Sequence, residues 1–199
     1  MQQSLTTKKF NTRKLVLIGM LSGISMFLGL SNIGFIPLPW MKVTIMHVPA
    51  IIGGIVEGPI VGAIVGLIFG LFSVYDNITR PVSLFSPFFM NPIISIIPRV
   101  LIGIVSYYVY RFIKNKFNKE NIGIGIAAAA GTITNTVGVL GLVYIFTVNN
   151  LTIVKGIDPT TIGATLLTIV GTNCVPEIIV SILLVVPICL GLFRLYNRK

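Results

Sequence analysis

Long apolar runs separated by short polar segments dominate the chain. Six runs stand out, and they cover residues 15–35, 43–56, 59–74, 92–112, 122–146 and 160–193. A membrane-spanning helix needs about 20 mostly apolar residues, and a shorter run fits a tilted or partly interfacial helix. The pattern therefore predicts six transmembrane helices.

Two of these runs depart from the ideal length. Run 43–56 is short, whereas run 160–193 is too long for one straight crossing. Pro176 lies inside the long run, and a proline inside a helix removes a backbone hydrogen bond and favours a kink. We therefore expect Pro176 to kink the last helix.

Composition agrees with a membrane protein. The mean hydropathy is +0.95, with 54% apolar and 10% charged residues, which lies outside the usual range of soluble globular domains. No polar stretch is longer than a loop. We predict an all-α integral membrane protein with one domain over residues 1–199, in which a segment 1–14 precedes a six-helix bundle 15–193 and a tail 194–199.

Basic residues predict the orientation, because positively charged loops stay on the cytoplasmic side. With both termini inside, eleven of the 15 lysines and arginines fall on inner segments and three fall on outer loops. The remaining one, Arg99, lies within a span. Topology and attraction to anionic membrane lipids account for the net charge of +10, so no nucleic-acid partner is needed. The expected location is the bacterial cytoplasmic membrane.

Motifs for chemistry are missing from the sequence. It contains no HExxH, no GxSxG and no GxxxxGK[ST] phosphate loop. Cys174 and Cys189 lack metal-ligand spacing, and His47 is the only histidine. The sequence thus predicts neither catalytic residues nor a metal or cofactor, and it favours a binding protein or transporter over an enzyme. An intramembrane enzyme using Glu177 and His47 is the competing class.

Polar residues within the spans predict a binding pocket. At about 1.5 Å per residue, three helices bring Arg99, Asn135, Asn173 and Glu177 to similar depths in the outer half of the bilayer. Such groups should face inward and pair with each other or with a ligand, because an isolated charge in the membrane is costly. An arginine suits a carboxylate or phosphate. Snorkelling of Arg99 towards the headgroups and a structural Arg99–Glu177 bridge are the alternatives.

Outer loops rich in proline, asparagine and aromatic residues should form the rim of this pocket. They contribute Trp40 and Asn91 as further candidates for contact with the substrate. His47, in the second run, is either a pocket residue or a packing residue.

Glycines mark two helix faces. Gly58, Gly62, Gly66 and Gly70 recur at every fourth residue, a spacing that lets another backbone approach closely, and we expect them to pack within the chain. Gly19 and Gly23 form a similar pair on the first run. Packing inside the chain and packing against a partner are both open for that pair.

The segments "TIMHVPAIIGGIVEGPIVGAIVGLIFGL" and "FSPFFMNPIISIIPRVLIG" resemble the second to fourth spans of the S components of energy-coupling factor (ECF) vitamin transporters, especially pantothenate-type members. The resemblance implies capture of a vitamin from outside and ATP-driven uptake through a transmembrane coupling subunit and two ATPase subunits. It also implies that the S component topples in the membrane. Family members dock through an alanine-xxx-alanine motif on the first helix, and Gly19 and Gly23 stand in its place here.

Other transport functions remain open at this stage. The chain could be a stand-alone secondary transporter of a small organic anion. It could also be the S component for niacin, folate, riboflavin or pyridoxine, because an arginine in the pocket suits several vitamins or their precursors. Pantothenate is the best single choice.

Overall fold

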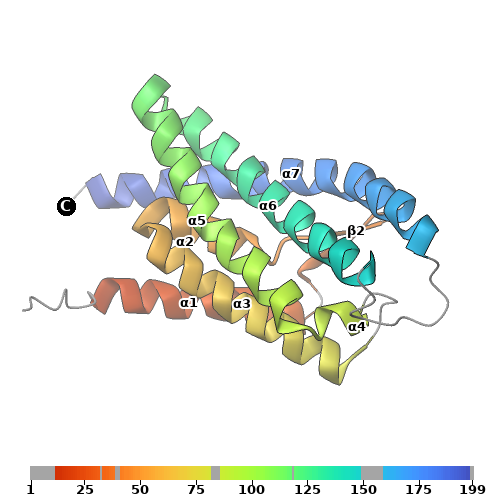
Figure 1. Cartoon of the computed structure of the whole chain (residues 1–199). Helices are drawn as coiled ribbons and strands as arrows, with labels where there is room; N and C mark the ends of the chain where they lie inside the picture. The colour runs from red at the N-terminus through yellow and green to blue at the C-terminus, as the bar shows by residue number, and fades with distance from the viewer. Residues whose placement is uncertain are drawn as a thin grey trace, which may run out of the picture.

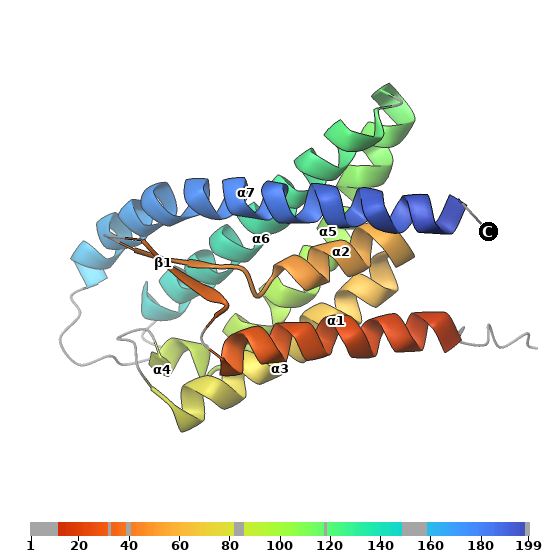
Figure 2. The same ribbon diagram turned by 180° about the vertical axis from the view of Figure 1, so that it is seen from behind.

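The computed structural model describes residues 12–31, 33–38, 41–81, 86–117, 119–148 and 159–197. Seven helices and a two-stranded hairpin are found in this part of the chain (Figures 1 and 2). In chain order these are α1 (Thr12–Leu30), β1 (Phe35–Leu38), β2 (Met41–Thr44), α2 (Val48–Glu57), α3 (Pro59–Thr79), α4 (Ser86–Phe89), α5 (Pro92–Phe117), α6 (Glu120–Val148) and α7 (Pro159–Asn197).

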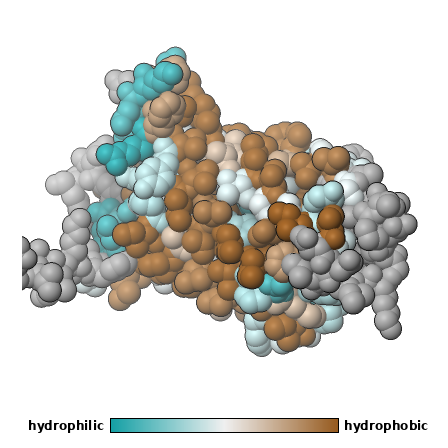
Figure 3. Space-filling model, viewed as in Figure 1, coloured by the Kyte–Doolittle hydropathy of each residue, from teal (hydrophilic) through white to brown (hydrophobic). Residues whose placement is uncertain are grey.

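Five helices are long and apolar enough to cross a membrane: α1, α3, α5, α6 and a stretch of α7 over Val170–Leu195. Helices α3, α5, α6 and α7 pack on one another in that order, and α2 lies among α1, α3, α5, α6 and α7. Both α1 and α7 run along one face of the bundle in Figure 2. Apolar side chains cover most of the face seen in Figure 3. Hydrophilic residues gather at the upper left, at the end of the bundle where α5 ends and α6 begins. The molecule is therefore a multi-pass membrane protein.

The second apolar run differs from expectation. Its first two residues, 43 and 44, belong to β2, which pairs antiparallel with β1 from Phe35 opposite Thr44 to Leu38 opposite Met41. Helix α2 starts only at Val48, with Pro49 in its first turn, where proline is well tolerated. Its ten residues span about 15 Å, half of the hydrocarbon core. The second run thus forms a strand end and a short helix instead of a full span, while the all-α fold class holds apart from this two-stranded hairpin.

The last helix extends beyond its apolar run at both ends. Helix α7 continues from Pro159 to Asn197 with Pro176 and Pro187 inside it. Pro176 therefore does not end the helix, and the kink expected there stays a prediction. Proline costs a helix one backbone hydrogen bond, and packing along the rest of a 39-residue helix outweighs this loss.

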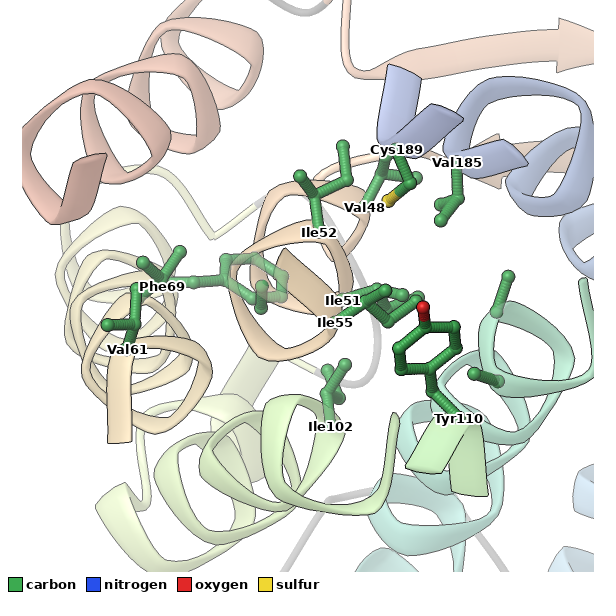
Figure 4. Packing of buried hydrophobic residues seen from close by; sticks show 14 of the residues in the cluster. Val48, Ile51, Ile52, Ile55, Val61, Phe69, Ile102, Tyr110, Val185 and Cys189 are labelled. Carbon is green, nitrogen blue, oxygen red and sulfur yellow. The ribbon is translucent and has the colours of Figure 1, made fainter. Parts of the chain in front are cut away.

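Helix α2 lies at the centre of the apolar core. Eight of its ten residues are buried, so it packs on all sides and not along a single stripe. Figure 4 shows Ile51 and Ile55 of α2 among Ile102 and Tyr110 of α5, with Val185 of α7 nearby. This packing fixes the position of the residues that precede α2, which contribute to the polar layer described below.

The repeated glycines of α3 pack within the chain, as expected. A Cβ atom added to Gly66 would collide with the backbone oxygen of Arg99, and one added to Gly70 would lie 2.8 Å from that of Ser95. At Gly62 it would lie 2.7 Å from the Cα atom of Gly54 and 2.8 Å from that of Gly103. Glycine thus lets α2, α3 and α5 approach backbone to backbone.

Gly58 has a different role in the same sequence repeat. It joins α2 to α3 with φ of 105° and ψ of 175°, a conformation that favours glycine. Pro59 follows at the start of α3. This tight connection keeps the two helices adjacent.

We expect Gly62→Val to destabilise the protein strongly. The new side chain has no space between the Gly54 and Gly103 backbones, and overpacking costs about 1–3 kcal/mol. Thermal unfolding in detergent should therefore show a lower Tm. Gly171→Ala is the control, because nothing lies within 4 Å of a Cβ atom there. An unchanged Tm for Gly62→Val would contradict this account of the helix contact.

Candidate functional site

Arg99 is held inside the bundle by the local geometry of α5. Pro98 cannot donate the backbone hydrogen bond that Ile94 O would accept in a regular helix. The Arg99 Nη1 atom donates to that same oxygen at 2.9 Å. The guanidinium carbon also lies 5.7 Å from the ring centre of Phe69 and 5.6 Å from that of Phe89, within the range of cation–π contact.

The charge of Arg99 is not paired with a carboxylate in the described part of the chain. The ion pairs found there join Arg13 to Glu57 and Lys114 to Glu120. Arg99 is only 7% exposed, and its Nε atom has no hydrogen-bond partner. The structural Arg99–Glu177 bridge is therefore not formed, and the buried guanidinium retains a free donor.

Glu177 instead accepts hydrogen bonds from two threonines. Its Oε1 atom accepts from the backbone N of Thr44 at 3.2 Å and from the Thr44 hydroxyl at 3.0 Å. Its Oε2 atom accepts from the Thr136 hydroxyl at 3.1 Å. The residue is 6% exposed, so both carboxylate oxygens are buried and occupied.

His47 directly precedes α2, and its side chain contacts α6 instead of capping α2. Its Nε2 atom lies 3.0 Å from the Thr132 hydroxyl, which itself donates to Ala128 O at 3.0 Å. Because a hydroxyl has one proton to donate, Thr132 accepts here and the histidine proton belongs on Nε2. The Nδ1 atom is then a buried acceptor, and it has no partner. His47 is close enough to Arg99 for electrostatic interaction.

Asn135 lies on α6 between Thr132 and Thr136. Its Oδ1 atom is buried and has no hydrogen-bond partner. One turn further along α6, Gly138 approaches Pro98, with 3.1 Å between the Pro98 Cβ atom and an added Cβ atom. This contact places the polar part of α6 against the turn of α5 that carries Arg99.

The other predicted site residues have different outcomes. Asn91 caps α5, and its Oδ1 atom accepts from the backbone N of Ile93 at 3.0 Å. Asn173 is half-buried, one turn from Glu177 on α7. Trp40 lies outside the described residues. The structure thus brings Arg99, His47, Asn135 and Glu177 into one buried layer, which we call the polar layer.

Sequence reasoning missed three threonines and two aromatic residues that contact the polar layer. Thr132 and Thr136 are one turn apart on α6, flank Asn135 within "GTITNTVG", and share a buried face. Their four-residue spacing could have indicated a polar helix face that includes both threonines. Thr44, Phe69 and Phe89 gave no such signal, because each reaches the layer through packing between distant segments.

A groove of about 380 Å³ lies elsewhere, between α6 and α7. Its lining is apolar, for example Leu140 and Leu167, and includes none of the predicted site residues. Over the described ranges, no group of His, Cys, Asp or Glu side chains could hold a metal ion. Cys174 and Cys189 are free, buried thiols.

Comparison with known proteins decides the family. Residues 13–189 match the family described as "ECF transporter, substrate-specific component". The chain belongs to this family. It is 36% identical over 178 residues to the pantothenic acid transporter PanT of Lactococcus lactis subsp. cremoris, covering 82% of this chain and 83% of that protein. It is 34% identical over 163 residues to the pantothenate transporter PanT of Leuconostoc mesenteroides subsp. mesenteroides, covering 78% and 79%.

Membership of the ECF family of substrate-specific components makes the chain a transporter component and not an enzyme. The exposed face of α1 is relevant here, because it carries the glycine pair predicted from the sequence. Both Gly19 and Gly23 are exposed, and nothing lies within 4 Å of a Cβ atom added to either. The two glycines therefore do not pack within the described part of this ECF component.

Proposed function

We propose that this protein is the substrate-binding subunit of an ECF-type importer and that it captures pantothenate from outside the cell. The observation that carries this proposal is the buried guanidinium of Arg99, which has no carboxylate partner among the described residues and lies in the same polar layer as two unpartnered buried atoms, His47 Nδ1 and Asn135 Oδ1. The two relatives named above are pantothenate transporters, and they support the choice of vitamin.

The chemistry of pantothenate complements these three groups. The molecule has a carboxylate at one end, an amide in the middle and two hydroxyls at the other end. Arg99 Nε offers a charge-assisted hydrogen bond to the carboxylate. His47 Nδ1 and Asn135 Oδ1 are acceptors for a hydroxyl or amide proton. Asn173 is a further contact in this proposal, because it lies on α7 one turn from Glu177.

The proposed orientation has both termini in the cytoplasm. The start of α1, the end of α7 and the connection between α5 and α6 all lie at one end of the bundle (Figure 1). Basic residues at that end include Arg13, Arg111, Lys114 and Arg194, and the positive-inside rule places them in the cytoplasm. The β hairpin and α4 then face outward, with α2 counted as the sixth, incomplete span.

ATP-driven uptake requires partners in this proposal, because the sequence contains no phosphate-binding loop of the GxxxxGK[ST] type. The partners are a transmembrane coupling subunit and two ATPase subunits, as the family implies. The exposed glycines of α1 offer a surface for the coupling subunit, since small residues let another helix approach closely.

We expect the purified chain to bind pantothenate but not to transport it alone. Isothermal titration calorimetry should detect binding, with niacin, folate, riboflavin and pyridoxine as competitors. Proteoliposomes with the chain alone should show no ATP-dependent uptake, and adding the partner subunits should restore it. Uptake by the chain alone, driven by a proton or sodium gradient, would instead support a secondary transporter. Tight binding of another vitamin would overturn the choice of pantothenate.

A further inference from the structure

The carboxylate of Glu177 faces a strand end and a helix, not an open space. Three neutral donors surround it: the Thr44 backbone N, the Thr44 hydroxyl and the Thr136 hydroxyl. Thr44 is the last residue of β2 and pairs with Phe35 of β1. Glu177 thus joins the hairpin to α6 and α7 across 133 residues of sequence.

The segment after the hairpin is anchored a second time on α6. His47 lies three residues beyond Thr44 and contacts Thr132, one helical turn from Thr136. The chain between the hairpin and α2 therefore lies along the polar part of α6 and is fixed at both ends. Glu177 accepts three hydrogen bonds at the Thr44 anchor, two of them from Thr44, whereas the His47 anchor has one hydrogen bond.

A direct role of Glu177 in binding an anion conflicts with its charge. A carboxylate beside the carboxylate of a substrate would repel it. Each oxygen of Glu177 already accepts at least one hydrogen bond, whereas Arg99, His47 and Asn135 each retain an atom without any partner. The groups free to bind substrate and the group that binds the hairpin are thus different.

We propose that Glu177 is a positioning residue: its carboxylate clamps the end of the β hairpin onto α6 and α7, and thereby sets how readily the hairpin detaches from the polar layer. The clamp itself does not depend on which substrate binds. Only its effect on substrate release rests on the proposed function.

Hydrogen–deuterium exchange of residues 35–46, measured on the substrate-free protein in lipid nanodiscs, tests the clamp. Glu177→Ala should speed exchange of these amides about 10-fold, the factor that corresponds to about 1.4 kcal/mol. Glu177→Gln should stay within about twofold of the parent, because its Oε1 atom still accepts from Thr44 and its amide can donate to Thr136. Unchanged exchange in Glu177→Ala would overturn the proposal.

A second pair of variants covers the case in which Glu177→Ala does not fold. Thr44→Val removes the hydroxyl and keeps the backbone donor, so exchange should rise by a smaller factor, whereas Thr44→Ser should behave like the parent. Thr134→Val is the matched control, because the Thr134 hydroxyl donates only to Ala130 O within α6. Equal exchange in Thr44→Val and Thr134→Val would contradict the clamp.

Release of radiolabelled pantothenate separates the clamp from a role as a substrate ligand. The clamp predicts faster release from Glu177→Ala and Thr44→Val, with near-normal release from Glu177→Gln. A ligand role that requires the negative charge predicts that Glu177→Gln is as defective as Glu177→Ala while Thr44→Val is normal, and this result would overturn the proposal. If no variant and no parent protein binds pantothenate, the proposed function fails, while the exchange experiment still decides the clamp.

Discussion

Arg99→Ala should weaken pantothenate binding about 10- to 100-fold. A hydrogen bond to a charged group contributes about 1.5–3 kcal/mol, and about 1.4 kcal/mol changes affinity tenfold. Arg99→Lys should restore only part of the affinity, because an ammonium lacks the planar fork and the Nε donor. Titration calorimetry on the detergent-solubilised variants measures both effects.

Two controls make this result interpretable. Arg111→Ala removes an exposed arginine from the other end of α5, where it donates to the Tyr107 hydroxyl, and it should leave affinity unchanged. Arg99 also satisfies the Ile94 oxygen, so the Tm and elution volume of each variant must show that it is folded. A folded Arg99→Ala protein with normal affinity would assign Arg99 a structural role in the turn around Pro98.

Replacing Gly19 and Gly23 together by leucine should abolish assembly with the coupling subunit and therefore ATP-driven uptake. Two leucines on a small-residue face keep a neighbouring helix at a distance. Because nothing lies within 4 Å of either position, the chain itself can accommodate them, and pantothenate affinity should stay within a few-fold. Co-purification with a tagged coupling subunit is the direct measurement.

Gly171→Leu is the control for this pair. It adds a leucine at an exposed glycine of α7 that also has nothing within 4 Å, and it should leave assembly intact. If the double variant still assembles, the coupling subunit docks on another surface. If binding of pantothenate is lost as well, the α1 face supports the fold and the docking role is wrong.

Local patterns predicted the long helices and the close packing of α3 within the chain. Apolar runs of sufficient length gave α1, α3, α5 and α6, because length and hydrophobicity decide membrane insertion. The four-residue glycine spacing gave the contact of α3 within the chain, because small residues on one face have few other uses in a membrane helix. Pro98 leaves the Ile94 oxygen without a backbone donor in α5, but neither this oxygen nor its bond from Arg99 was predicted.

Long-range contacts could not be predicted in the same way. The segment around Pro37 and Trp40 resembles a loop, and the hairpin forms because a second strand happens to follow in register. Thr44 and Glu177 are 133 residues apart, and neither has a neighbouring pattern that points to the other. A threonine in a helix usually bonds to its own backbone, as Thr134 does, so the outward bond of Thr136 is visible only in three dimensions.

The central position of α2 has a consequence for tolerance to substitution. In α1 the buried positions are Ile18, Ser22, Ser25 and Gly29, so packing within the chain constrains a sequence change about once per helical turn, and the exposed side is constrained only where a partner docks. Eight of the ten α2 residues are buried, and no face of this helix is available for harmless change. Variation among proteins with this fold should therefore follow a helical period in α1 and be nearly uniformly low in α2, which is buried along almost its whole length.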